Sequence, residues 1–129
     1  MSETITLYRP VGQQELKLIA ATGYRTFPPR PPEQPIFYPV LNEAYATQIA
    51  QNWNSRLNDP PVGYVTRFQV RREYLRRYEV QIVGGLEHAE YWIPSEELDE
   101  FNRNIVGTIE VIAQYRGAKV GTDDAKGAG

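Results

Sequence analysis

A proline-rich segment at residues 24–35, YRTFPPRPPEQP, restricts what this chain can fold into more than any other feature. Five of its residues are proline. Proline fixes φ and donates no backbone hydrogen bond, so the segment is neither a helix nor a central strand. Tyr24 and Phe27 give it apolar surface to bury. We therefore expect an ordered, extended loop that crosses the protein surface.

The remaining composition is typical of one globular domain. The chain has 129 residues, of which 41% are hydrophobic and 23% charged, enough for one core. We assign residues 1–117 to a single domain and residues 118–129, rich in glycine, alanine and charge, to a flexible tail. The net charge of −2 gives no overall attraction to nucleic acid or membranes. No segment resembles a signal peptide or a membrane span, so we expect a cytoplasmic protein.

The spacing of apolar residues predicts the order of elements. Alternation predicts strands at 4–9, 36–41, 63–70, 79–85, 88–94 and 108–115. Helical spacing predicts helices at 12–22 and at 43–54, the second with Asn42 as its N-cap. A third helix is predicted after Ser95, which would be its N-cap. We also predict one or two helical turns at 71–78 and a turn at 58–61. Because Gly84-Gly85 joins two predicted strands as a hairpin, we expect an α+β fold.

The only histidine, His88, lies in the segment GGLEHAEYWIP (84–94). His88-Ala89-Glu90 matches half of the H-x-E signature of zinc deaminases, but the chain has no cysteine for the other half. A zinc site needs three or four protein ligands, so we predict no metal. A serine–histidine–aspartate triad is disfavoured because no serine lies in a nucleophile-elbow context. Alternation places His88, Glu90 and Trp92 on one strand face, where a His88–Glu90 salt bridge is the simplest expectation.

Arginines at 71, 72, 76 and 77 form a local basic cluster. The functional interpretation is binding of a phosphate, a nucleotide or an RNA end. The structural interpretation is a solvated helix face, with Leu75 and Tyr78 turned inward. The acidic total charge favours the second, so nucleic acid is an unexpected partner.

Four segments carry a resemblance to a known family. They are LYRPVG (7–12), FPPRPPEQPIFYPVLNEAYATQIAQNWN (27–54), GYVTRF (63–68) and EYWIPSEELDEFNRNIVGTIEVI (90–112). Together they resemble a family of short bacterial proteins labelled "ADP-ribosylation/crystallin J1", over residues 5–112. The crystallin J1-like hydrolases are all-helical with clustered aspartates that bind magnesium, and this strand-rich chain does not fit them. The layout is instead similar to an ADP-ribosyltransferase-like fold, with split β-sheets and three main helices.

This resemblance implies roles for five residues. Arg9, which follows Leu7 and Tyr8 on the first strand, would bind the ribose or phosphates of NAD, with Tyr8 beside it. Tyr38 would stack on nicotinamide. Glu90 would hold a ribose hydroxyl and stabilise the oxocarbenium-like transition state, and His88 would assist it. His88 replaces the second acidic residue of arginine-specific transferases, which disfavours arginine as the acceptor.

The expected function is therefore NAD-dependent ADP-ribosyl transfer, or NAD hydrolysis, with an unknown acceptor. Two departures from the family pattern keep a second class open. Pro10 replaces the usual glycine after the strand-1 arginine, and Pro39 directly follows Tyr38. With nine tyrosines suited to protein contacts, they favour a non-catalytic binding or scaffolding module that keeps the fold. The third alternative is nucleotide or RNA-end binding through residues 71–77.

Overall fold

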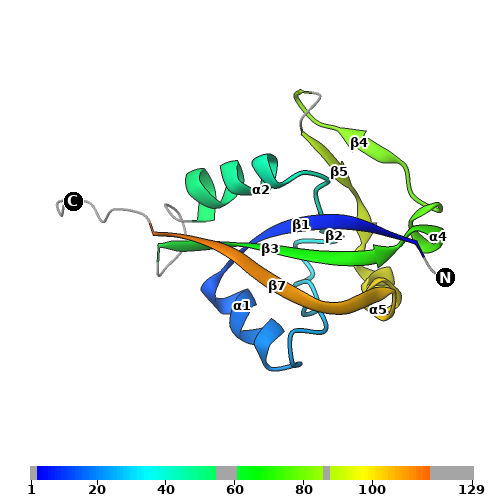
Figure 1. The fold of residues 1–129 in the computed structure, drawn as a ribbon, viewed down its shortest axis with the longest axis horizontal. Helices are drawn as coiled ribbons and strands as arrows, with labels where there is room; N and C mark the ends of the chain where they lie inside the picture. The colour runs from blue at the N-terminus through cyan, green and yellow to red at the C-terminus, as the bar shows by residue number, and fades with distance from the viewer. Residues whose placement is uncertain (1–2, 55–60, 86–87, 117–129) are drawn as a thin grey trace.

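The computed structural model describes residues 3–54, 61–85 and 88–116 of the chain. A three-stranded antiparallel sheet runs through its centre (Figure 1). Its strands, in spatial order, are β1 (Thr4–Gly12), β3 (Val62–Arg71) and β7 (Ile105–Arg116). Two smaller antiparallel pairs, β2 with β6 and β4 with β5, complete the strands. The predicted tail at 118–129 and most of the predicted turn at 58–61 lie outside the described residues.

Strand β1 is longer than the predicted 4–9, and its geometry explains why Pro10 does not end it. The backbone of Tyr8 bonds outward, exchanging hydrogen bonds of 2.9 and 2.8 Å with Val40 on the side away from β3. Alternate residues of a strand direct their N–H groups to the same side. Pro10 therefore lies where its missing N–H would point away from β3, which is the position that an edge strand tolerates.

Helices α1 (Gln13–Ala20) and α2 (Glu43–Ile49) lie on opposite sides of the three-stranded sheet (Figure 1). α2 continues as one π-helical stretch, η1 (Ala50–Asn54). The predicted N-cap is confirmed, because Asn42 accepts a hydrogen bond of 2.7 Å from the backbone of Tyr45. The chain leaves α1 through Gly23, whose φ of 75° is a left-handed conformation that glycine adopts without strain.

The predicted strand at 36–41 is only partly a strand. β2 (Ile36–Phe37) pairs with β6 (Ile93–Pro94), and the chain then loses regular pairing at Tyr38 and Pro39. Val40 restores it as an isolated bridge, because it pairs with Tyr8 on one side and Glu90 on the other. This short segment therefore connects β1 to the β4–β5 pair.

The predicted hairpin around the glycine pair is confirmed in its antiparallel pairing. β4 (Val80–Ile82) pairs with β5 (Ala89–Tyr91), and both strands are shorter than predicted. Tyr91 is buried, but Trp92 is 44% exposed. Consecutive side chains of an extended chain point to opposite faces, so Trp92 lies on the face of Glu90 and not on that of Tyr91.

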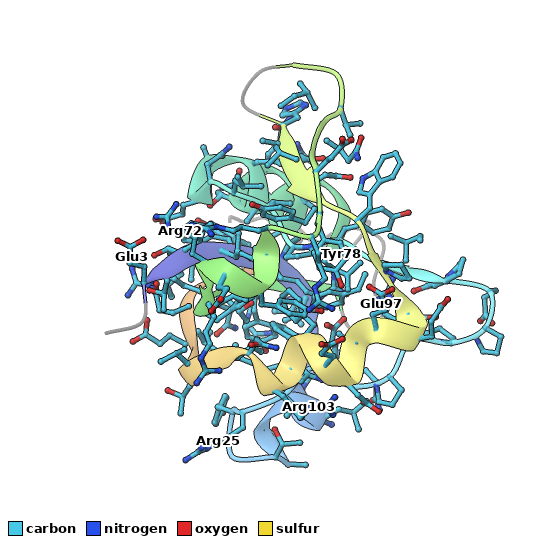
Figure 2. All side chains as sticks on the ribbon, turned by 90° about the vertical axis from the view of Figure 1, so that its right-hand side faces the viewer. Glu3, Arg25, Arg72, Tyr78, Glu97 and Arg103 are labelled. Carbon is cyan, nitrogen blue, oxygen red and sulfur yellow. The ribbon has the colours of Figure 1, made fainter. Side chains whose placement is uncertain are left out.

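The predicted Ser95 cap is wrong. Ser95 is instead the first residue of a 3-10 turn, η2 (Ser95–Glu97), which leads into α5 (Leu98–Arg103), and neither start carries a side-chain cap hydrogen bond. The 3-10 turn supplies its own backbone bonds, so a serine cap is not needed. Figure 2 shows Glu97 beside Tyr78, which follows the one-turn helix α4 (Arg72–Leu75) and donates a 2.5 Å hydrogen bond to Glu97.

The larger core cluster contains a group of phenylalanines. Phe27, Phe37, Phe68 and Phe101 are all at most 2% exposed, and their ring centroids lie 4.8 to 6.2 Å apart in edge-to-face or tilted contacts. Such aromatic pairs add stability beyond their buried area. The proline-rich segment therefore contributes a core residue, Phe27.

Asn102 of α5 ties this segment to the domain. Its amide bonds both the N–H and the carbonyl of Phe27, each at 3.0 Å. The expectation that Tyr24 is also buried is wrong, because Tyr24 is 39% exposed with a φ of 62°. Its carbonyl instead accepts a 2.7 Å hydrogen bond from Ile109 of β7.

The chain is thus a mixed α and β structure with small antiparallel sheets, as predicted. The described residues contain three helices of more than one turn together with the single turn α4. Within the same residues, no helix has both the length and the apolar character that crossing a membrane requires.

Candidate functional site

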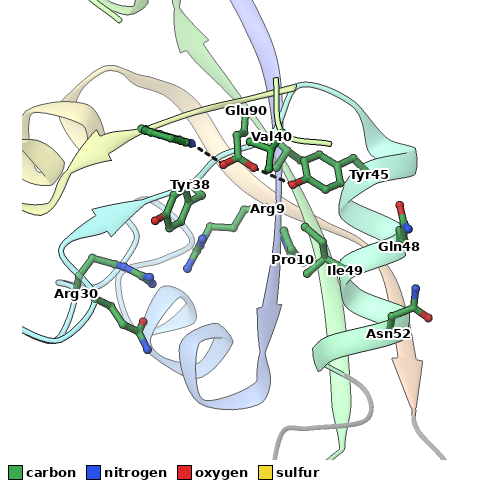
Figure 3. Close-up of a pocket in the computed structure, with 13 residues that line it drawn as sticks. Arg9, Pro10, Arg30, Tyr38, Val40, Tyr45, Gln48, Ile49, Asn52 and Glu90 are labelled. Atoms are coloured by element: carbon green, nitrogen blue, oxygen red, sulfur yellow. Dashed lines mark hydrogen bonds between the residues drawn. The ribbon is translucent and has the colours of Figure 1, made fainter. Parts of the chain in front are cut away.

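A cavity of about 870 Å³ opens beside the outer edge of β1 (Figure 3). Its walls come from five parts of the chain: β1, the proline-rich segment, residues 38–40 after β2, helix α2 with η1, and strand β5 with the residues around it. Val40 lies among its lining residues. Because Val40 pairs with both β1 and β5, this one residue sets the spacing between the strands that carry Arg9 and Glu90.

Arg9 comes from β1 and is 7% exposed. Its Nε and Nη2 donate hydrogen bonds of 2.8 and 3.0 Å to the two carboxylate oxygens of Glu15 on α1. The guanidinium carbon lies 4.6 Å from the ring centre of Phe37. This bidentate pair and the cation–π contact hold Arg9 in one orientation.

Glu90 comes from β5 and is also 7% exposed. Oε1 accepts a hydrogen bond of 2.9 Å from the Tyr45 hydroxyl, and Oε2 accepts one of 2.6 Å from the Trp92 indole (Figure 3). A buried carboxylate is costly unless its oxygens are bonded. These two donors offset that cost and fix the direction of the carboxylate.

Two aromatic side chains flank this carboxylate at the cavity mouth. Tyr38 is 40% exposed, and its ring lies edge-to-face with Trp92 at a centroid distance of 6.4 Å. Both residues line the cavity. Exposed rings that border a cavity with charged walls are suited to a ligand that carries a flat aromatic group.

Tyr45 lies between Glu90 and His88. Burial, and next the hydrogen bond to Glu90, raise the pKa of Tyr45 to about 12, so its hydroxyl remains a donor at neutral pH. His88 stacks on the Tyr45 ring at 4.5 Å, and its ring nitrogens lie 3.0 Å from the Val83 carbonyl and 3.2 Å from Gln48 Oε1. The expected His88–Glu90 salt bridge is wrong, since Tyr45 occupies the position of Glu90's partner.

The structure brings together three of the five predicted site residues. Arg9, Tyr38 and Glu90 line the same cavity, although they lie on three different segments of the chain. His88 contacts the cavity residues Tyr45 and Gln48, not the carboxylate itself. Tyr8 packs against the smaller core cluster around Val40, because neighbouring residues of a strand point to opposite faces.

Several cavity residues carry no signal of function in the sequence. Tyr45 lies in the predicted helix at 43–54, where its spacing is that of an apolar stripe, and Trp92 lies in the predicted strand at 88–94. The spacing of two between Glu90 and Trp92 was the available signal, since it places both on one face. Glu15 is not among the lining residues but holds Arg9, and the sequence does not show this contact because it depends on how α1 folds back on β1.

Arg30 is the cavity residue that comes from the middle of the proline-rich segment. It lies between Pro28-Pro29 and Pro31-Pro32 and lines the cavity with Gln34. Figure 3 shows its guanidinium directed toward that of Arg9. Burial, and next the nearby Arg9 charge, lower the pKa of Arg30.

The arginine cluster at 71–77 is largely engaged within the protein. Arg72 pairs with Glu3 at 3.1 Å (Figure 2), and Arg77 pairs with Glu100 at 3.1 Å. Arg71 donates a 3.2 Å hydrogen bond to the carbonyl of Arg103. These contacts agree with the structural interpretation, but the helix predicted at 71–78 is a single turn in which only Arg72 of the four arginines lies. Among residues 3–54, 61–85 and 88–116, no group of three or more acidic or histidine side chains could hold a metal ion.

Comparison of the chain with protein-family models, with curated proteins and with solved structures finds no match.

Proposed function

We propose that the chain binds NAD in this cavity and uses Glu90 to break the bond between nicotinamide and ribose. The observation that carries the proposal is the placement of Glu90. Its buried carboxylate is held by two donors in the same cavity as the Arg9 guanidinium and the exposed ring of Tyr38. Negative charge, positive charge and an aromatic face are the three features that NAD would need there.

The chemistry follows from the charge of each group. The glycosidic carbon–nitrogen bond breaks, its electron pair moves to the nicotinamide nitrogen, and nicotinamide leaves as a neutral molecule. Positive charge then develops on the ribose ring, where the fixed negative charge of Glu90 stabilises it. Water or an acceptor nucleophile forms the new bond to the ribose carbon and releases one proton.

The strand arrangement supports the proposal. A three-stranded sheet and the β4–β5 pair are linked only through Val40 in the described ladders, which is compatible with the split sheets of an ADP-ribosyltransferase-like fold. The residue two positions before Glu90 is His88, which stacks on Tyr45 and contacts Gln48 through a ring nitrogen. Arginine therefore remains a disfavoured acceptor.

A second candidate is a module that binds NAD without turnover. The pairing of Arg9 with Glu15 favours it, because two of the guanidinium donors are already used within the protein. In this candidate Arg9 stabilises the fold and does not act in catalysis. The cavity then binds a nucleotide, either alone or together with a protein partner.

The deciding assay measures free nicotinamide after incubation with NAD. Wild type should release nicotinamide, and Glu90→Gln should reduce the rate about 100-fold or more, because an interaction made in the transition state is lost. Glu110→Gln is the matched control, since Glu110 is an exposed carboxylate on β7, and it should keep the wild-type rate.

Binding of NAD is measured separately by calorimetry. Binding without nicotinamide release from the wild type supports the second candidate. Absence of both binding and release contradicts the two candidates together.

A further inference from the structure

Arg30 is held in place by the backbone that surrounds it. Two prolines precede it and two follow it, so the φ angle is fixed at four of the five positions from 28 to 32. The neighbouring Phe27 is anchored in the core and bonded on both sides to Asn102. A ligand that contacts Arg30 therefore meets a side chain whose attachment point is already ordered.

The guanidinium of Arg30 has unsatisfied hydrogen-bonding capacity. Its Nε is buried and has no hydrogen-bond partner. A buried donor without a partner is destabilising. An acceptor in the cavity would reach Nε only if the side chain shifts, whereas the end of the guanidinium is already directed toward Arg9 (Figure 3).

The charges around the cavity favour an anion at this end. The carboxylates of Glu15 and Glu90 already have partners within the protein: Glu15 is bonded to Arg9, and Glu90 is bonded to Tyr45 and Trp92. Neither of them is bonded to Arg30. Arg30 faces Arg9 across the cavity (Figure 3), and burial together with the Arg9 charge lowers the pKa of Arg30. Two guanidinium groups that face each other are stabilised by negative charge placed between them.

We infer that Arg30 binds a phosphate or diphosphate group, with Arg9 on the other side of the same subsite. The inference deepens the proposed function and rests on it for the identity of the ligand: the diphosphate of NAD lies at the Arg30 end, and the nicotinamide ribose lies at Glu90. The fork of a guanidinium matches the geometry of phosphate oxygens.

The test compares Arg30→Gln with Arg25→Gln. Arg25 is an exposed arginine at the start of the same segment, so both variants lose one positive charge from one stretch of chain. Three probes are used in calorimetry: inorganic pyrophosphate, ADP-ribose and nicotinamide riboside, which has no phosphate. Thermal melting of each variant checks that the protein is folded.

Arg30→Gln should weaken pyrophosphate and ADP-ribose binding about tenfold or more, as loss of a charged hydrogen bond predicts. Arg25→Gln should bind both as wild type does, and nicotinamide riboside should bind all three proteins equally. Arg30→Lys should recover part of the affinity, because it restores charge without the fork. Equal pyrophosphate and ADP-ribose affinities in Arg30→Gln and Arg25→Gln would overturn the inference, as would no binding of either probe to the wild type.

The two proposals fail in different ways. Pyrophosphate binding that depends on Arg30, without nicotinamide release from NAD, supports the anion subsite and contradicts catalysis. Nicotinamide release with an unchanged KM for NAD in Arg30→Gln contradicts the subsite and leaves catalysis in place.

Discussion

The hydroxyl of Tyr45 donates a hydrogen bond of 2.9 Å to Oε1 of Glu90, and this contact joins helix α2 to strand β5. The same tyrosine ring carries the His88 imidazole on its face. Tyr45 thus connects the carboxylate with the single histidine. The orientation of Glu90 depends on this helix as much as on its own strand.

Replacing Tyr45 by phenylalanine should lower the free energy of unfolding by about 1 to 2 kcal/mol, because one oxygen of a buried carboxylate loses its donor. Urea denaturation measures the change. Tyr24→Phe is the control, since Tyr24 is exposed and should change stability by less than about 0.5 kcal/mol. Equal stability of the two variants would show that water replaces the Tyr45 hydroxyl without cost.

The Arg9–Glu15 pair should be far more important for stability than an exposed pair of the same kind. The two side chains are 9% and 21% exposed, so Glu15→Gln leaves a nearly buried guanidinium without its counter-charge and should cost about 3 kcal/mol. Glu110→Gln breaks the Arg67–Glu110 pair, whose side chains are 40% and 56% exposed, and should cost less than about 1 kcal/mol. Similar losses in the two variants would contradict the structural part assigned to Glu15.

Stability should fall at alkaline pH, in part through Tyr45. Its pKa is raised from an ordinary value of 10.0 to about 12 in the folded protein. The protonated phenol therefore stabilises the fold fully below pH 10.0, and that contribution is lost as the pH rises through about 12. Urea unfolding between about pH 8 and about pH 11.5 should show a smaller loss in Tyr45→Phe than in the wild type.

Tyr78 provides a second case in the same pH series. Burial, and next the hydrogen bond to Glu97, raise the pKa of Tyr78, so Tyr78→Phe should also reduce the alkaline loss. An alkaline loss that is identical in the wild type and the two variants would mean that neither half-buried phenol contributes to the pH dependence.

The phenylalanine cluster should dominate core stability. Phe101 is fully buried and contacts Phe37, Phe68 and Tyr74 with ring centroids 5.3 to 6.2 Å away. Phe101→Ala should therefore cost about 3 to 5 kcal/mol through lost burial and the cavity that remains. Val111→Ala truncates a side chain that is 41% exposed and should cost about 1 kcal/mol or less. Equal costs would place Phe101 outside the core.

Gly84 and Gly107 form a matched pair for testing how His88 is held. Both have positive φ, 89° and 82°, so alanine is strained by about 1 to 2 kcal/mol at either position. A Cβ at Gly84 would lie 3.3 Å from His88 Nδ1, whereas at Gly107 nothing lies within 4 Å. Gly84→Ala should therefore shift the imidazole NMR signals of the single histidine, and Gly107→Ala should not. Unchanged His88 signals in Gly84→Ala would show that the loop moves instead of the ring.

Local pattern was sufficient where neighbouring residues decide the structure. Asn42 caps its helix because its side chain reaches a backbone N–H three residues later. The prolines of 24–35 exclude helix and strand by their own covalent geometry. Alternation placed Glu90 and Trp92 on one face of the chain, and their hydrogen bond is possible for that reason.

The same reasoning fails where a contact depends on distant segments. Ser95 resembles a cap, but the chain enters α5 through a 3-10 turn. Alternation gives Tyr8 and Arg9 opposite faces, yet it does not tell which face borders a cavity. His88 and Glu90 share a face in sequence, but α2 brings Tyr45 to the carboxylate.

The sequence by itself determined the absence of thiol chemistry, the ordered proline-rich segment, the α and β elements and the face on which each side chain of a strand lies. Only the tertiary structure decided that Arg9, Arg30, Tyr38 and Glu90 share one cavity. The reason is that local spacing fixes the direction of a side chain relative to its own backbone, whereas strand neighbours are set by pairing across the chain. Here that pairing passes through Val40, which bonds to Tyr8 on one side and lies opposite Glu90 on the other.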